Sequence, residues 1–116
     1  MKVNELMVGD LVYVHEPECK GHRIDAIDEL DGQVGADGEV YDECDIRPIP
    51  FTEEILVKNG WRKESITIDG DYANWHGEIP ICQEEDEFNY ERIELTYVHQ
   101  LQHLLRLCDI EKEIEL

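Results

Sequence analysis

The residues of this chain best suited to chemistry are two histidines four positions apart, His99 and His103, in the stretch His-Gln-Leu-Gln-His. On a helix this spacing places both imidazoles on one face, where they can bind one metal ion, as in the zinc-protease pattern His-Glu-x-x-His. That chemistry needs the glutamate as general base for the metal-bound water. Gln100 stands there instead, and no third ligand follows downstream. We expect a solvent-facing polar stripe without a metal, and keep a small metal-binding or hydrolytic module as an alternative.

Nucleophilic catalysis would need a cysteine beside a histidine. Cys44, Cys82 or Cys108 could pair with His76 or His99 only through tertiary contacts. Cys108 is predicted to lie on the apolar stripe of the last helix, where a buried thiol is unreactive. The four cysteines are at least 25 residues apart and form no Cys-x-x-Cys pair. This spacing is typical of reduced thiols in a cytoplasmic protein.

Carboxylate pairs occur throughout the chain, so a single pair indicates little. Two acidic segments of the second half, Asp69-Gly70-Asp71 and residues 84–87, do not follow the pattern of the EF-hand calcium loop. We predict that the first is a turn and the second a solvated loop. Glycine-rich phosphate-binding motifs are missing from the sequence, so we expect no cofactor. Core packing explains most of the aromatic residues between acidic neighbours, but Tyr72 or Trp75 would anchor a protein interface if it were exposed. The predicted partner-binding residues are Asp69, Asp71, Tyr72, Trp75, Glu84, Glu85, Asp86 and Glu87.

The charge balance indicates which partners are possible. The 116 residues contain 29 Asp and Glu against 10 Lys and Arg, a formal charge of -19. A small domain usually carries a magnitude of only about 2–8. Residues 1–50 and 51–116 are similarly acidic, at net -9 and -10. Such a field repels nucleic acid and anionic membranes and attracts basic protein surfaces. We expect a basic protein as partner, with no direct nucleic-acid or membrane binding.

The first half of the chain is predicted to be an SH3-like barrel or meander over about residues 7–50. Turn signals at Asp31-Gly32 and Asp37-Gly38 separate short stretches rich in β-branched residues. Pro48 and Pro50 are expected to prevent strand pairing after the last stretch. Within the second strand, Ile24 and Ala26 should share a face opposite Ile27. The predicted strands are Leu11–Val14, Arg23–Ile27, Gln33–Ala36 and Glu39–Tyr41.

The second half is predicted to be α+β, forming a 51–116 subdomain packed on a 1–50 subdomain as one compact unit. Thr52 is a good N-cap for a helix over 52–59, with Gly60 after its end. Antiparallel strands follow over 62–95, beginning at Ser65–Ile68, and Pro80 should make one of them an edge or irregular strand. A helix over 96–108 carries an apolar stripe opposite a face with His99, Gln102, His103 and Arg106, before a closing strand at 113–116.

Two blocks of the sequence resemble small uncharacterised proteins of bacterial prophages and mobile elements. They are Pro-Ile-Pro-Phe-Thr, at 48–52, with Lys-Asn-Gly, at 58–60, and Tyr-Val-His-Gln-Leu-Gln, at 97–102. The resemblance implies a mobile-element setting and no particular mechanism.

Together these observations favour a non-enzymatic, acidic protein-binding module. Its sharper form is a nucleic-acid mimic that inhibits a host defence nuclease or another DNA-binding protein, of the anti-restriction or anti-CRISPR type. The small metal-binding or hydrolytic module using His99 and His103 remains one alternative. An architectural subunit of a larger assembly is the other.

Overall fold

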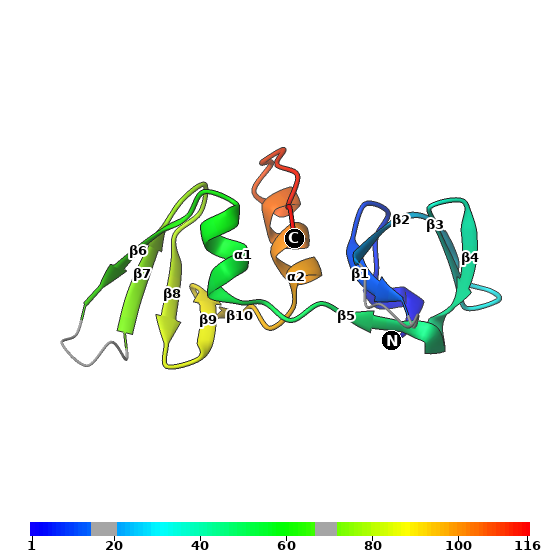
Figure 1. Cartoon of the computed structure of the whole chain (residues 1–116), viewed down its shortest axis with the longest axis horizontal. Coiled ribbons are helices and arrows are strands. Elements are labelled where there is room, and N and C mark those ends of the chain that lie inside the picture. Colours follow the sequence, from blue (N-terminus) through cyan, green and yellow to red (C-terminus); the bar gives the residue numbers. More distant parts are fainter. Residues whose placement is uncertain (15–20, 67–71) are drawn as a thin grey trace. The chain divides into compact units, whose positions relative to one another are not determined.

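The computed structural model describes residues 1–14, 21–66 and 72–116. The fold is α+β, with two five-stranded antiparallel sheets and two α-helices in this described part (Figure 1). The chain divides into two units. The first combines Met1–Pro50 with Tyr97–His103, and the second combines Phe51–Thr96 with Leu104–Leu116. One boundary falls after Pro50, and Tyr97–His103 groups with the first unit.

The sheet of the first unit has the strand order β4-β3-β2-β1-β5. The four predicted strands are confirmed within a residue or two at each end. Asp37 and Gly38 both have positive φ, 53° and 81°, as the tight turn between β3 and β4 demands. No closed barrel is found in the described residues. The strands are β1 Leu11–Val14, β2 Gly21–Asp28, β3 Gln33–Ala36, β4 Glu39–Asp42 and β5 Ile46–Pro48, with short 3-10 helices at Val3–Glu5 and Glu43–Asp45.

Two details of this sheet differ from the prediction. Pro48 does not prevent pairing, since β5 pairs with β1 and Pro48 lies opposite Val12. A proline is tolerated there because β5 is an edge strand. A register shift in β2 between Ile24 and Ala26 changes which side chains share a face. Ile24 is buried and Ile27 packs against the same core, whereas Ala26 is exposed.

The core of the first unit is a cluster of aliphatic side chains from the amino-terminal segment and four strands. Each is almost completely removed from solvent, which is the main favourable contribution to folding. Met1, Ile27 and Tyr41 pack against the cluster from its margin. The buried members are Val3, Leu6, Val12, Ile24, Val34 and Ile46.

Helix α1 (Glu53–Lys58) of the second unit begins and ends as its sequence predicts. The Thr52 hydroxyl accepts a hydrogen bond from the Ile55 amide at 3.4 Å. After the helix, the Trp61 amide donates to the Leu56 carbonyl at 2.9 Å, the bond that defines a Schellman cap. Gly60 supplies the required positive φ, 94°.

The sheet of the second unit has the order β10-β9-β8-β7-β6. Its first strand begins at Arg62 instead of Ser65, and Thr67 and Ile68 lie outside the described residues. Pro80 precedes β8, which is the central strand and not an edge. The strand β9 was not predicted. The strands are β6 Arg62–Ser65, β7 Tyr72–His76, β8 Ile81–Glu84, β9 Glu87–Tyr90 and β10 Ile93–Glu94.

Helix α2 (Val98–Leu107) confirms the predicted apolar stripe in part. Val98, Leu101, Leu104 and Leu105 are buried. The end of the stripe was predicted wrongly, because the helix stops at Leu107 and Cys108 is exposed after it. The carboxy-terminal residues 113–116 form no strand, although Ile114 is buried and the Glu115 amide donates to Asn59 Oδ1 at 2.8 Å.

Candidate functional site

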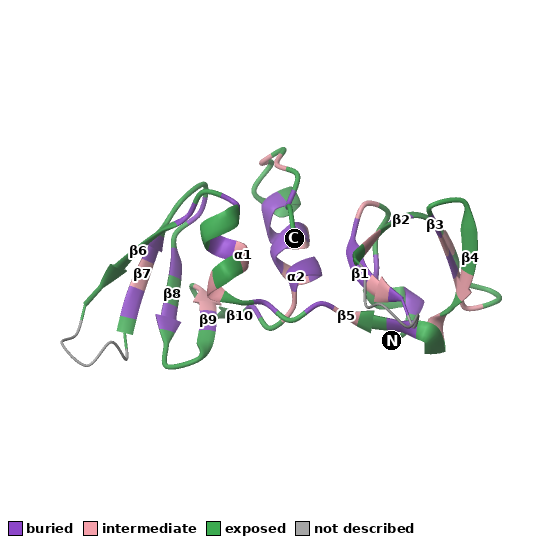
Figure 2. Ribbon diagram, viewed as in Figure 1, coloured by how far each residue is buried: buried purple, intermediate pink, exposed green. Residues whose placement is uncertain are grey.

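The sheet of the second unit has one buried and one exposed face, and the pairing register decides which residues lie on each. Buried and exposed positions alternate along β7 and β8 (Figure 2). Trp75 lies opposite Ile81, Ala73 lies opposite Gln83, and all four side chains are buried. Trp75 is only 1% exposed and its indole N–H donates to Gln83 Oε1 at 2.9 Å. Trp75 therefore packs inside the protein, and the prediction of an exposed interface anchor is wrong for this residue.

The exposed face of this sheet is acidic. One row of paired residues crosses all five strands and has a glutamate at each end, Glu64 on β6 and Glu94 on β10. The neighbouring row contains Tyr72, Glu84 and Glu87, all exposed. The Tyr72 hydroxyl donates to Glu84 Oε1 at 3.1 Å. We call this surface, formed by Glu64, Tyr72, Glu84, Glu87 and Glu94, the acidic face.

The densest charge on the acidic face is at the hairpin between β8 and β9. Glu84 and Glu87 are directly opposite each other, and only Glu85 and Asp86 connect them. Like charges directly opposite on neighbouring strands destabilise a sheet. Glu85 also has a φ of 54°, a conformation uncommon for residues other than glycine. The hairpin therefore maintains four adjacent carboxylates at a cost to stability. Asp69 and Asp71, predicted to join this surface, lie outside the described residues.

Few basic groups lie on this face of the described strands. His76 and Arg62 are paired at one end, and His76 Nε2 lies 2.7 Å from Glu64 Oε2. Lys63 instead forms an ion pair with Glu53 at 3.0 Å. The hydrogen bonds that Lys63 and Gln83 donate to Glu53 lower the pKa of this carboxyl. The paired basic groups Arg62 and His76 therefore lie at the β6 edge of the face, whereas Glu84 and Glu87 lie on β8 and β9.

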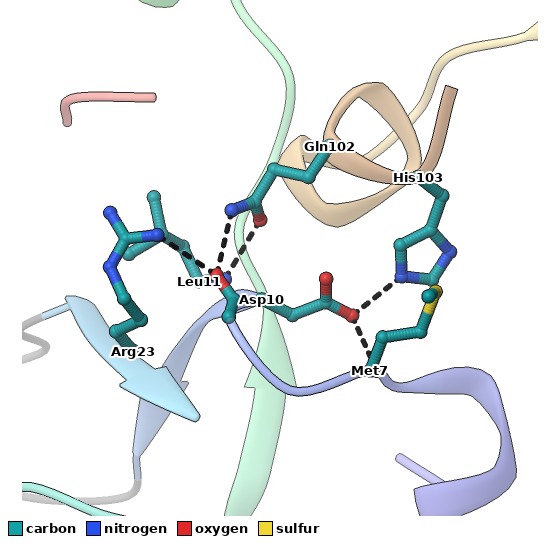
Figure 3. A network of polar contacts seen from close by, with 7 residues as sticks. Met7, Asp10, Leu11, Arg23, Gln102 and His103 are labelled. Atoms are coloured by element: carbon teal, nitrogen blue, oxygen red, sulfur yellow. Dashed lines mark hydrogen bonds and ion pairs between the residues drawn. The ribbon is translucent and has the colours of Figure 1, made fainter. Parts of the chain in front are cut away.

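The first unit contains a second candidate, built around His99 and His103. Their ring centroids lie 5.5 Å apart, so the two imidazoles do gather as the spacing predicts. The expected solvent-facing stripe is wrong for His99, which is 6% exposed, and for Gln102, which is also buried, whereas His103 is half-buried and Arg106 is exposed. His103 Nε2 lies 2.6 Å from Oδ2 of Asp10, whose side chain is fully buried (Figure 3).

Gln102 explains why this face of the helix is buried. Its Oε1 accepts from the Leu11 amide at 2.8 Å, and its Nε2 donates to the Gly9 carbonyl at 2.9 Å (Figure 3). The Gly9 carbonyl also accepts from Arg23 Nη1 at 3.0 Å. The side-chain amide thus pairs with main-chain groups at the start of β1, where pairing with β5 has not yet begun. Gln102 therefore pairs with the main chain of the sheet and is almost completely buried.

Both histidines line a cavity of about 730 Å³ in the first unit. Burial, followed by the nearby His103, lowers the pKa of His99, while Asp10 and Glu5 oppose that shift. The Cys44 thiol is exposed and forms no hydrogen bond with either imidazole in the described part. Among the described residues no group of three or more metal-ligating side chains is found. The lining residues are Met1, Glu5, Cys44, Ile46, Arg47, Pro48, Tyr97, His99, Gln100 and His103.

Sequence reasoning missed Asp10, the buried partner of His103. The only local signal at this position is the Gly9-Asp10 turn, which says nothing about a residue 93 positions away. Compared with known proteins, the chain matches no protein-family model, no curated protein and no solved structure. Neither described helix has the length and apolar character required to cross a lipid bilayer.

Proposed function

We propose that this protein is a non-enzymatic binding module whose acidic face contacts a basic surface of a partner protein. The observation that carries the proposal is the direct opposition of Glu84 and Glu87, both exposed, at the hairpin between β8 and β9 of a face with few basic groups. This opposition weakens the sheet, although Glu84 also accepts a hydrogen bond from the Tyr72 hydroxyl at 3.1 Å. A cationic partner would neutralise the repulsion, and the overall charge of -19 would speed the encounter.

The sharper form of the proposal is that the acidic face imitates a nucleic-acid backbone. Side chains on neighbouring strands are about 4.7–4.9 Å apart, and duplex DNA carries one charge per about 1.7 Å of its axis. The carboxylates of the face are sparser than the charges of DNA, but Glu84 and Glu87 lie on neighbouring strands, and Glu64 and Glu94 carry the negative charge to both edge strands. The partner would be a host defence nuclease or another DNA-binding protein, and the module an inhibitor of the anti-restriction or anti-CRISPR type from a phage or mobile element.

The proposal also includes an architecture for the first unit and a location for the protein. We infer an SH3-like architecture, supported by the order β5-β1-β2-β3-β4 and by the 3-10 helix Glu43–Asp45 directly before β5. A cytoplasmic location is supported by the free thiols of Cys44, Cys82 and Cys108 among the described residues.

The test compares two charge reversals of equal size. Glu84→Lys with Glu87→Lys changes the acidic face, whereas Glu29→Lys with Asp31→Lys changes exposed residues of the first unit by the same net charge. Each immobilised protein is incubated with host lysate and with purified DNA-binding proteins, then eluted with increasing salt. We expect a basic protein on the wild type and on the control, released by moderate salt, and its loss from the acidic-face variant.

Three results would contradict the proposal. Equal retention of the partner by both variants would show that only net charge matters. Capture of no basic protein at low salt would remove the partner. Tight association of the protein itself with a polynucleotide would contradict the electrostatic reasoning.

A further inference from the structure

We propose that His99 and His103 together bind one divalent ion of the late first-row transition metals, such as Zn²⁺, Ni²⁺ or Co²⁺, in the cavity of the first unit. The two residues lie one helical turn apart, with ring centroids separated by 5.5 Å, and both line the same cavity of about 730 Å³. This site is independent of the acidic face and of the function proposed for it.

His103 is oriented for metal binding by its partner. Its Nε2 lies 2.6 Å from Oδ2 of the fully buried Asp10, so Nδ1 is the ring nitrogen that remains for a ligand. Metal-bound histidines almost always donate their other ring N–H to a carboxylate, carbonyl or water, which fixes the tautomer and makes the imidazole a stronger ligand. The contact between Asp10 and His103 joins an imidazole to a carboxylate in this way.

His99 contributes a buried imidazole to the wall of the same cavity. Its Nδ1 is closed to solvent and has no hydrogen-bond partner among the described residues. Nε2 is therefore the nitrogen of His99 that would bind a metal ion in the cavity.

The donor set determines which metals fit. Imidazole nitrogens suit Zn²⁺, Cu²⁺, Ni²⁺ and Co²⁺, whereas Mg²⁺ and Ca²⁺ prefer oxygen ligands. Since no group of three protein ligands is found in the described part, water completes the coordination in the cavity. We therefore expect weaker binding than at a closed structural zinc site, which has four protein ligands.

The test is a calorimetric titration of untagged protein with Zn²⁺ in millimolar Mg²⁺, which occupies the many surface carboxylates. We expect one Zn²⁺ per chain, with affinity reduced at least tenfold (about 1.4 kcal/mol) by His99→Gln or His103→Gln. Asp10→Asn keeps both ligands but weakens binding by about 10–100-fold, as loss of an outer partner does. His76→Gln, which removes an exposed histidine of the second unit, leaves the affinity unchanged.

A second measurement does not depend on the variants folding. Paramagnetic Co²⁺ added to the wild-type protein should selectively broaden the ring proton resonances of His99 and His103, leaving those of His76 unchanged. The proposal is overturned if Mg²⁺ abolishes Zn²⁺ binding, if His76→Gln weakens binding as much as His103→Gln, or if Co²⁺ broadens all histidines equally.

Discussion

Replacing Gln102 by Met tests whether the helix side chain completes the sheet of the first unit. Met is unbranched and similar in length, so it fills the space of the glutamine without its amide. The Leu11 amide would lose the acceptor that now lies 2.8 Å away and would remain buried. The Gly9 carbonyl would keep its bond from Arg23 at 3.0 Å. One unsatisfied buried donor costs about 1–3 kcal/mol, and we expect the free energy of unfolding to fall by that amount.

Urea denaturation gives the change in free energy, and amide hydrogen exchange shows where it arises. The Leu11 amide should be protected in the wild type and should exchange faster in the Gln102→Met protein, with less change at Val12. Leu107→Ala is the matched control, because Leu107 lies on the same helix but is 82% exposed, and such surface changes stay within about 0.5 kcal/mol. Unchanged stability together with unchanged Leu11 exchange would refute the assignment of Gln102 as a main-chain partner.

Three further predictions concern pH, surface charge and a turn. Because burial lowers the pKa of His99, the unfolded chain binds more protons, so the free energy of unfolding should fall as pH drops below about 6.5. The other ionisable groups acting on this ring are His103, Asp10 and Glu5. Urea melts across that range should show the slope, and His99→Phe should flatten it. Glu87→Lys should raise the melting temperature by replacing a repulsive pair with Glu84 by an attractive one, worth about 0.2–1 kcal/mol. Gly60→Ala, at φ 94°, should cost about 1–2 kcal/mol in urea melts, and no loss would contradict the Schellman cap.

Elements with local signals were predictable from the sequence. The Asp37-Gly38 turn and the caps of α1 depend on residues a few positions apart, and each follows its signal. Strand β9 also had a signal, the alternation of Glu87-Phe88-Asn89-Tyr90, but the acidic run before it was interpreted as a loop. The bulge in β2 could not be predicted, since it arises from pairing with β3 and leaves no mark in residues 24–26.

The two candidate sites also differ in whether local sequence could predict them. The position of Glu84 and Glu87 follows from a short hairpin, so their exposure could be predicted from the local sequence. The burial of His99, by contrast, depends on packing between segments far apart in the chain. Asp10 and His103 are 93 positions apart, and periodicity on the helix shows only which residues share a face, not what covers that face. A polar helix face was therefore taken for a solvated one.

The two candidate sites can be separated experimentally, because each lies within one unit. The acidic face contains only residues of the second unit, whereas Asp10, His99 and His103 all belong to the first. Reversing Glu84 and Glu87 should therefore remove the partner and leave the Zn²⁺ stoichiometry at one. His103→Gln should weaken the metal and leave partner capture intact. Loss of both partner capture and Zn²⁺ binding in one variant would show that the two sites are coupled. If that variant were the reversal of Glu84 and Glu87, the charge of the acidic face would also affect metal binding in the first unit.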